Sequence, residues 1–234
     1  MDGVLTRTAS VHAAAWKQTF DAYLQARAAL TGESFVPFDE VKDFAAYVDG
    51  RPRVDGTRTF LASRHIALPE GDPDDPPDNE TVHGLSNLKN RNLRERFRAG
   101  GVEAYEGSVR YVEAARDAGL MRAVVSASAN AAEVLAAARI DHLFQARVDG
   151  TTVERDDLPG KPAPDSFIAA AAALGVEVDA AAVFEDAPAG VAAGRAGHFR
   201  WVVGVDRVGQ AAQLYAQGAD IVVNDLADLL DGPQ

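Results

Sequence analysis

Two adjacent carboxylates, Glu185 and Asp186, stand directly after the apolar residues Val183 and Phe184. A short apolar run of this kind is typical of a buried strand, so the pair is expected at the carboxyl end of that strand. Carboxylate oxygens are the ligands that a hard divalent cation such as Mg²⁺ prefers, either directly or through water. Adjacent acidic residues are usually solvated surface, and the pair alone leaves both interpretations open.

A second polar segment, Ser126-Ala127-Ser128-Ala129-Asn130, follows the apolar residues 124–125. Hydroxyl groups and backbone N–H groups at the start of a helix can converge on an anion, so the segment could bind phosphate. Ser128 or Asn130 could equally serve only to cap the helix that follows. The segment alone leaves phosphate binding and helix capping equally open.

Lys161 lies in residues 160–167, where two prolines fix the loop before a helix that is predicted to start near Asp165. A lysine held in place suits a bound anion, because it can balance phosphate charge and hold a neighbouring carboxylate. An exposed lysine without a ligand is the alternative. At the start of the chain, Asp2 and Gly3 form an acidic turn that would be ordinary by itself.

Short apolar strands alternate with helices after residue 100. Strands are predicted at 121–126, 147–149, 181–184, 201–205 and 221–223, and helices at 108–118, 131–139, 165–174, 189–194 and 210–216. This alternation predicts an α/β fold with a doubly wound parallel sheet that is buried on both faces. Ligands bind at the carboxyl ends of the strands in such a sheet, so the polar segments are expected to meet at one edge.

Residues 10–99 are predicted to be all-helical. Helices are expected at 10–24, where Ser10 can act as the cap, and at 39–48, 55–64 and 81–98, each opened by a capping residue. Residues 71–78, with three prolines and four aspartates, are predicted to be a solvated loop, because their spacing is not that of a calcium-binding EF-hand. We therefore expect a core of residues 1–9 and 100–234, with residues 10–99 inserted as a helical domain.

Composition narrows the class of protein. The 234 residues, 47% hydrophobic and 25% charged, are typical of a soluble globular protein, and the net charge of −12 argues against nucleic acid or an anionic membrane as a partner. The absence of cysteine excludes disulfides and thiolate sites, and the five histidines are too dispersed for a metal site. No signal peptide or membrane span is expected, so we expect a cytoplasmic protein, and we expect a monomer.

Taken together, four segments resemble the motifs of the haloacid dehalogenase superfamily in order and approximate spacing. They are Asp2-Gly3-Val4-Leu5-Thr6, residues 126–130, residues 160–165, and Glu185-Asp186 with Gly190. Segments of the inserted domain resemble the β-phosphoglucomutase branch, in which a small helical cap closes over a sugar phosphate: Thr8, residues 12–16, residues 50–53, and Lys89-Asn90. The resemblance covers essentially the whole chain and implies a Rossmann-like core with a helical cap.

The resemblance implies roles around a reacting phosphoryl group. In this family an aspartate attacks the phosphoryl group to form an aspartyl-phosphate, and an aspartate two positions later is the general acid and base. Asp2 matches this second aspartate, Ser126 the hydroxyl that holds the phosphoryl group, and Lys161 the lysine that neutralises it. Asp2, Glu185 and Asp186 match ligands of Mg²⁺.

The resemblance also implies residues that bind the substrate away from the reacting group. Arg53 resembles the residue that grips a distal phosphate, with a solvated arginine as the alternative, and His12 resembles one that positions the substrate near the acid/base aspartate. Five further residues match family positions that contact the substrate from the cap or from the core: Thr8, Lys89, Asn90, Ser128 and Asn130. For Trp16, packing in the cap core is the preferred interpretation.

The residue that matches the nucleophile would lie two positions before Asp2, ahead of Met1. We expect Met1 to be an internal methionine of an Asp-Met-Asp-Gly motif, with the first, central strand of the sheet truncated and the chain as written inactive by this route. Ala187 stands where relatives often have serine, which removes no expected ligand.

The expected function is that of a Mg²⁺-dependent enzyme that transfers a phosphoryl group on a small phosphorylated sugar. A β-phosphoglucomutase, which interconverts β-glucose 1-phosphate and glucose 6-phosphate, is the preferred hypothesis. A sugar-phosphate phosphatase with the same core motifs is the first alternative, because the two activities differ in how well water is excluded. A catalytically inactive sugar-phosphate-binding protein is the second.

Overall fold

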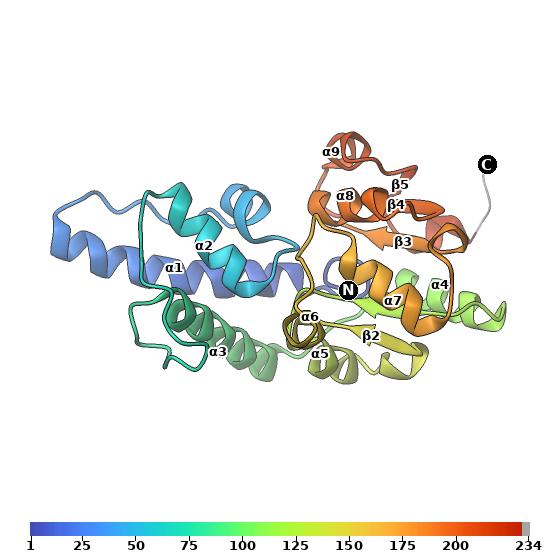
Figure 1. Cartoon of the computed structure of the whole chain (residues 1–234), viewed down its shortest axis with the longest axis horizontal. Coiled ribbons are helices and arrows are strands. Elements are labelled where there is room, and N and C mark those ends of the chain that lie inside the picture. Colours follow the sequence, from blue (N-terminus) through green and yellow to red (C-terminus); the bar gives the residue numbers. More distant parts are fainter. Residues whose placement is uncertain (231–234) are drawn as a thin grey trace. The chain divides into compact units, whose positions relative to one another are not determined.

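The computed structural model describes residues 1–230, which divide into two compact units (Figure 1). Of the described residues, 1–7 and 102–230 form one unit, here called the α/β unit. Residues Thr8–Gly101 form the other, here called the helical unit. The helical unit is therefore inserted into the α/β unit close to the start of the chain.

The strands of the α/β unit form two parallel sheets. β1 (Ala123–Val125) pairs with β2 (Ala146–Val148), and β4 (Trp201–Val205) lies between β3 (Ala182–Glu185) and β5 (Ile221–Val223). The predicted α/β class and parallel pairing are confirmed. The single sheet is wrong for residues 1–230, because no ladder there joins β1 to β3.

Residues 1–6 form a turn at the carboxyl ends of β1 and β3. The amino group of Met1 donates to the carbonyl oxygen of Val125 at 3.4 Å, and Asp2 and Thr6 form an isolated parallel bridge. Thr6 forms a second bridge with Ala104, where the chain returns from the helical unit. The expected truncation of a first strand stays a prediction.

Helices cover both sheets (Figure 1). α7 (Asp165–Leu174) packs on β1 and β2, α8 (Pro188–Ala196) on β3 and β4, and α9 (Ala211–Ala216) on β4 and β5. The remaining helices of the unit are α4 (Glu106–Asp117), α5 (Ala131–Ala137), α6 (Gly150–Arg155) and short 3₁₀ turns at Asp141–Leu143, Val178–Ala180 and Leu226–Leu229. Apolar side chains of these helices and strands form one core, with Phe167, Val183, Val191, Val202 and Leu214 among its members.

The helical unit contains three α-helices. They are α1 (Ala9–Thr31), α2 (Arg53–Ser63) and α3 (Val82–Gly100), with a short π-helix at Phe44–Val48. α1 runs past the predicted end because residues 25–31 are rich in alanine, arginine and leucine, which favour helix, and Gly32 ends it with a left-handed φ of 74°.

Several predicted helix caps are wrong. Ser10 lies inside α1, whose N-cap position is held by Thr8, and Asp55 lies inside α2, which begins behind Pro52. Thr81 is confirmed as a cap, since its side chain accepts a hydrogen bond from the Gly84 N–H. Local polar residues therefore indicate where helices begin only to within about a turn.

Aromatic side chains fill the core of the helical unit. Trp16 and Phe20 stack with ring centroids 5.0 Å apart, and the rings of Phe20 and Phe60 lie 4.0 Å apart, with Phe38 packed against both phenylalanines. Trp16 and Phe20 are buried one turn apart on α1, as the helical spacing predicts. The interpretation of Trp16 as a core residue is confirmed.

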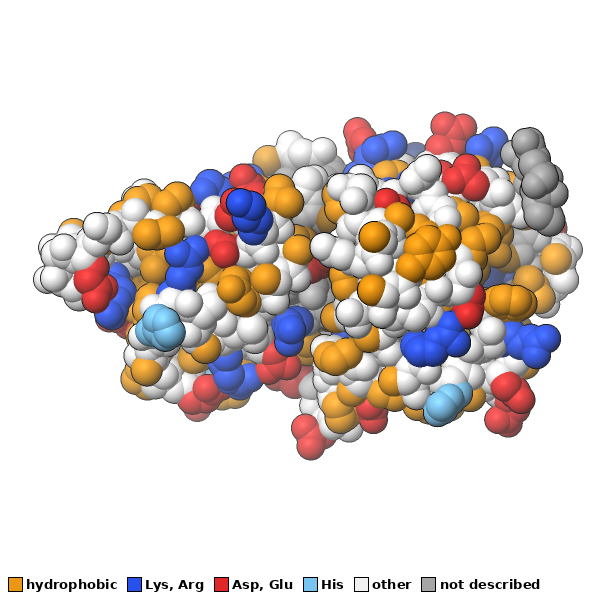
Figure 2. All heavy atoms as spheres, turned by 90° about the horizontal axis from the view of Figure 1, so that it is seen from above, with side chains coloured by type: hydrophobic (Ala, Val, Ile, Leu, Met, Phe, Trp, Pro, Cys, Tyr) orange, Lys and Arg blue, Asp and Glu red, His pale blue; other side chains and the backbone are white. Residues whose placement is uncertain are grey.

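Charge on the surface is mixed. On the face drawn in Figure 2, acidic and basic side chains are interspersed over the protein, and the net charge of the whole chain is −12. Among residues 1–230, no helix combines the length and the apolar character needed to cross a bilayer.

Replacing Phe20 should test the aromatic core. Because Phe20 is fully buried, Phe20→Ala should lower the free energy of unfolding of the helical unit by about 3–5 kcal/mol, the usual cost of such a cavity. Leu30→Ala on the same helix is the matched control, since Leu30 is 87% exposed, and it should cost about 0.5 kcal/mol or less. Urea unfolding followed by circular dichroism measures both; equal losses would contradict this account of the core.

Candidate active site

Two of the predicted site residues, Asp2 and Ser126, contact each other in the α/β unit. The Ser126 hydroxyl donates to Oδ2 of Asp2 at 3.2 Å. Ser126 directly follows β1, and its N–H donates to the carbonyl oxygen of Val148, so β-type pairing with β2 fixes its backbone. Its hydroxyl also accepts a hydrogen bond from the Ser128 N–H at 3.1 Å. The carboxyl end of β1 thus presents a buried hydroxyl to the N-terminal turn.

Asp186, which follows β3, reaches the same turn through Gly3. Gly3 has a φ of 66°, a left-handed conformation that glycine adopts without strain. A Cβ atom at residue 3 would lie 1.7 Å from Oδ2 of Asp186, so the backbone packs directly against this carboxylate. Residues 2 and 3 therefore contact the segment after β1 on one side and the segment after β3 on the other.

Lys161 and Glu185 form a buried ion pair. The Lys161 ammonium contacts the Glu185 carboxylate, and the two residues are only 8% and 4% exposed. Burial alone would raise the pKa of Glu185, but the ammonium beside it holds this pKa below its usual value. The exposed-lysine interpretation and, for Glu185, the solvated-surface interpretation are wrong.

Glycine makes room for this ion pair. A Cβ at residue 190 would lie 2.2 Å from Cδ of Glu185, so only glycine leaves space for the carboxylate at the start of α8. The second oxygen of Glu185 accepts a hydrogen bond from the Ala187 N–H at 3.3 Å. The Glu185 side chain is therefore held as an anion by a cation and a backbone dipole.

The carboxylates of Asp2 and Asp186 fit a magnesium ion by their chemistry. Mg²⁺ is commonly bound by one or two carboxylates together with substrate phosphate and water, and hard oxygen donors of this kind are present here. Within residues 1–230, no group of three acidic or histidine side chains converges, and Glu185 is engaged with Lys161. The residues thus fit an ion held by Asp2 and Asp186, while Glu185 as a third ligand stays a prediction.

Ser128 and Asn130 lie directly before α5. The Ser128 hydroxyl accepts a hydrogen bond from the Asn130 N–H at 3.2 Å, a local turn contact ahead of the helix. Asn130 occupies the N-cap position and is buried, but its side chain makes no capping hydrogen bond. Helix capping alone therefore explains neither the Ser128 contact nor the burial of Asn130.

Asp149 and Gly150 support this segment, and sequence reasoning did not single them out. A Cβ at residue 150 would lie 2.7 Å from the carbonyl oxygen of Ala127, and the Gly150 N–H donates to the carbonyl oxygen of Ser128 at 3.2 Å. The Asp149 carboxylate caps α6 by accepting from the N–H groups of residues 151 and 152. An aspartate after a strand, followed by Gly-Thr-Thr, is the N-cap signal that could have predicted this helix.

In the helical unit, His12, Lys89 and Trp16 form a cluster. The Lys89 ammonium lies 3.1 Å from Nδ1 of His12 and 4.9 Å from the centre of the Trp16 ring. Thr8 lies one turn before His12 and accepts the hydrogen bond of its N–H. Lys89 is buried, so this cluster holds a desolvated cation that the aromatic ring partly stabilises. Asn90 follows it on α3 and is half-buried.

Arg53, the first residue of α2, is tied to α3 through Asn87. One Arg53 N–H donates to Oδ1 of Asn87 at 3.1 Å, and the Asn87 amide donates to the carbonyl oxygens of Pro73 and Asp75 at 3.0 and 2.8 Å. The solvated-arginine interpretation is wrong in part, because Arg53 is half-buried. The same amide thus orders both Arg53 and residues 71–78, which form a loop as predicted.

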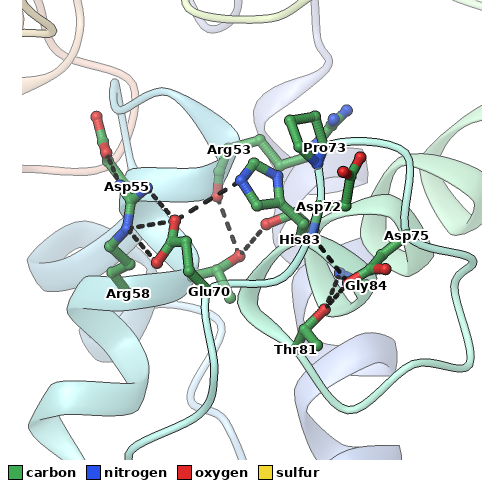
Figure 3. Close-up of polar contacts among 12 residues, drawn as sticks. Arg53, Asp55, Arg58, Glu70, Asp72, Pro73, Asp75, Thr81, His83 and Gly84 are labelled. Atoms are coloured by element: carbon green, nitrogen blue, oxygen red, sulfur yellow. Dashed lines mark hydrogen bonds and ion pairs between the residues drawn. The ribbon is translucent and has the colours of Figure 1, made fainter.

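Figure 3 shows how the rest of this loop is held. Thr81 donates to Oδ2 of Asp75 at 2.6 Å, and Arg58 binds the Glu70 carboxylate with two nitrogens while it also contacts Asp55. The Thr81 and Glu70 contacts join the loop and its approach to α3 and α2. The side chains of Glu70 and Asp75 are therefore engaged in local hydrogen bonds and ion pairs.

Comparisons with known proteins identify the family of this chain. A family model described as haloacid dehalogenase-like hydrolase matches residues 1–198. A Mycobacterium tuberculosis protein named β-phosphoglucomutase is 58% identical over 233 residues, which cover 98% of this chain and 89% of that protein. The chain belongs to the haloacid dehalogenase-like hydrolase family. The resemblance that the sequence motifs indicate is confirmed.

Solved structures of haloacid dehalogenase-like and related proteins share the fold. A hydrolase from Pseudomonas syringae superimposes with a TM-score of 0.77 at 23% identity, covering 99% of this chain and 94% of that one. A variant of CbbY from Rhodobacter sphaeroides in complex with xylulose-(1,5)bisphosphate has a TM-score of 0.72 at 20% identity, covering 98% and 93%. At these identities the likeness establishes the fold of this family member.

Replacing Gly3 should displace Asp186. Gly3→Ala adds a methyl group into the space of the Asp186 carboxylate and a left-handed alanine of roughly 1 kcal/mol strain. Gly209→Ala is the matched control, because residue 209 has a φ of 81° and nothing lies within 4 Å of its added Cβ. Urea unfolding should show a larger loss of stability for Gly3→Ala; equal losses would mean that Asp186 moves aside at no cost.

Asp149 should make stability depend on acid pH. Burial tends to raise the pKa of its carboxyl, but hydrogen bonds from the Thr151 hydroxyl and the Arg147 guanidinium hold the pKa below its usual value. Its contribution is therefore complete above the unfolded pKa of about 3.9 and is lost as the pH falls through the lower folded value.

Asp149→Ala should cost about 1–2 kcal/mol at pH 7, and the difference from the parent should shrink below about pH 4. Asp149→Asn is the control that keeps a capping oxygen without the charge, so it should lose less stability and show no comparable pH dependence. Unfolding in urea at a series of pH values measures this. A parent and an alanine variant with parallel pH curves would exclude the assigned role.

Proposed function

We propose that this protein is a Mg²⁺-dependent β-phosphoglucomutase that interconverts β-glucose 1-phosphate and glucose 6-phosphate. The observation that carries the proposal is the meeting of Asp2 and Ser126, joined by a hydrogen bond, with Asp186 packed on the adjacent Gly3. A hydroxyl donor and two carboxylates at strand ends suit phosphoryl transfer, in which catalysis is mostly positioning and charge stabilisation. The 58% identity to a protein of that name supports the choice of reaction.

The candidate site residues of the α/β unit have distinct roles in this proposal. Ser126 donates its hydroxyl to an oxygen of the transferring phosphoryl group, and Asp2 gives and takes the proton of the sugar hydroxyl. Lys161 supplies positive charge beside the phosphoryl oxygens, while its contact with Glu185 fixes the ammonium in place. When bound, Mg²⁺ would supply charge stabilisation of the phosphoryl oxygens, with Asp2 and Asp186 as its protein ligands and Glu185 as a further candidate.

A second set of residues binds the part of the substrate that does not react. Arg53 holds the distal phosphate, and the Lys89–His12 pair contacts the sugar or its phosphate together with Thr8 and Asn90. Ser128 and Asn130 contribute from the α/β unit. The bisphosphate bound to the Rhodobacter sphaeroides protein supports a ligand with two phosphate groups. A monomeric and cytoplasmic protein stays the expectation.

The test is to incubate β-glucose 1-phosphate and Mg²⁺ with the protein expressed from its whole gene. Glucose 6-phosphate should form. Release of inorganic phosphate without glucose 6-phosphate would replace the mutase with the phosphatase alternative. Binding of glucose 6-phosphate without either product would favour the binding protein.

Substitutions should separate the proposed roles in the active form. Asp2→Asn should lower kcat by about 10²-fold or more, since a general acid and base contributes that much. Asp186→Asn should lower activity and raise the Mg²⁺ concentration needed for half-maximal rate. Asp220→Asn is the matched control, because Asp220 binds Arg195 and the N–H of Val202, and it should keep the parent rate. Parent-like rates in Asp2→Asn or Asp186→Asn would refute these roles.

A further inference from the structure

Arg207, in the loop between β4 and α9, binds three other segments of the α/β unit. Its Nε donates to the carbonyl oxygen of Gly3 at 3.0 Å, and one terminal nitrogen lies 3.3 Å from the Ser108 hydroxyl. The other terminal nitrogen donates to the carbonyl oxygen of Asn224 at 2.7 Å and to Oδ2 of Asp225 at 2.9 Å. The side chain is only 14% exposed, which is unusual for an arginine.

The guanidinium group is fixed from its face as well as from its edges. Its centre lies 3.7 Å from the centre of the Tyr105 ring, a stacked cation–π contact. Arg207 also approaches the carbonyl oxygen of Val4 at 3.5 Å, the same oxygen that accepts the Ser108 hydroxyl at 2.6 Å. Because its partners are fixed, the planar guanidinium group of Arg207 is held in one orientation. A flexible lysine would not reproduce these contacts.

The same loop also holds Asp186. The Gln210 side chain donates to the carbonyl oxygen of Asp186 at 2.9 Å. The loop itself is rigid in its hydrogen bonding, because the Asp206 carboxylate accepts from the N–H groups of residues 208, 209, 210 and 211. Residues 206–210 therefore contact both the turn that carries Asp2 and the residue that follows β3.

We propose that Arg207 is a positioning residue that holds the Gly3 carbonyl so that Asp2 and Asp186 keep the separation that one divalent cation requires. Gly3 has a left-handed φ, and glycine has more backbone freedom than any other residue. The hydrogen bond from Arg207 to its carbonyl oxygen therefore restricts the conformation of the turn. This inference rests on the proposed function, in which Asp2 and Asp186 bind the cation. It adds a residue that touches neither the cation nor the substrate.

The test measures the affinity of the full chain for Mn²⁺ by electron paramagnetic resonance, with Mn²⁺ as the probe. Arg207→Gln and Arg207→Lys should each weaken Mn²⁺ binding by about 10- to 100-fold, the usual effect of removing a partner that orients metal ligands. Gln210→Leu should weaken it in the same direction, since it frees the Asp186 backbone. Lysine should not restore Mn²⁺ binding, because it keeps the positive charge but lacks the planar guanidinium group.

Arg195→Gln is the matched control. Arg195 also binds a backbone carbonyl, that of Gly218, and an aspartate, Asp220. It should lower the melting temperature but leave Mn²⁺ affinity unchanged, which separates positioning from general stability. Parent-like Mn²⁺ affinity in folded Arg207→Lys would overturn the proposal, as would equal weakening in Arg195→Gln. Should Arg207→Gln fail to fold, Arg207→Lys and Gln210→Leu decide the question in the same way.

Asp186→Asn separates this inference from the proposed function. If Asp186→Asn loses Mn²⁺ binding while the Arg207 variants keep it, only the role of Arg207 is refuted. If Asp186→Asn binds Mn²⁺ as tightly as the parent, the cation site of the proposed function is refuted as well.

Discussion

A side chain at residue 3 would occupy the space of the Asp186 carboxylate, and the candidate active site depends on this close approach. It allows the N-terminal turn to contact the segment after β3, while the Asp2 carboxylate accepts the Ser126 hydroxyl from the segment after β1. Three segments that are far apart in the chain thus place their polar groups at one turn. The β4–α9 loop completes the arrangement, because it binds the carbonyl oxygens of both Gly3 and Asp186.

The electrostatics of the site follow from a second buried contact. Lys161 and Glu185 are both removed from water, and each would be costly to bury without the other. Their pairing fixes the Lys161 ammonium in place and keeps Glu185 charged. Glycine at 190 leaves room for the Glu185 carboxylate of this pair. Glycine at 150 likewise lets the segment after β2 pack against residues 126–130.

Much of the secondary structure of the α/β unit could be predicted from the sequence, because short apolar strands alternate with helical segments there. The helix at 165–174 and the strands at 201–205 and 221–223 have the predicted bounds. The rule that ligands bind at strand ends selected Ser126 and Asp186, and the two prolines of its loop singled out Lys161. Arg207 was not predictable, since its partners come from distant segments that only folding brings together. The helix that Asp149 caps was missed because α6 has six residues and no apolar period.

We propose that Asp2 and Asp186 bind one divalent cation beside a phosphate group. Crystals of the protein grown with Mn²⁺ and glucose 6-phosphate would test this binding through the anomalous signal of the metal. One peak should lie about 2.1 Å from an oxygen atom of each residue, with a phosphate oxygen among its other ligands. A peak on other acidic residues, or bound phosphate with no metal at this turn, would contradict it.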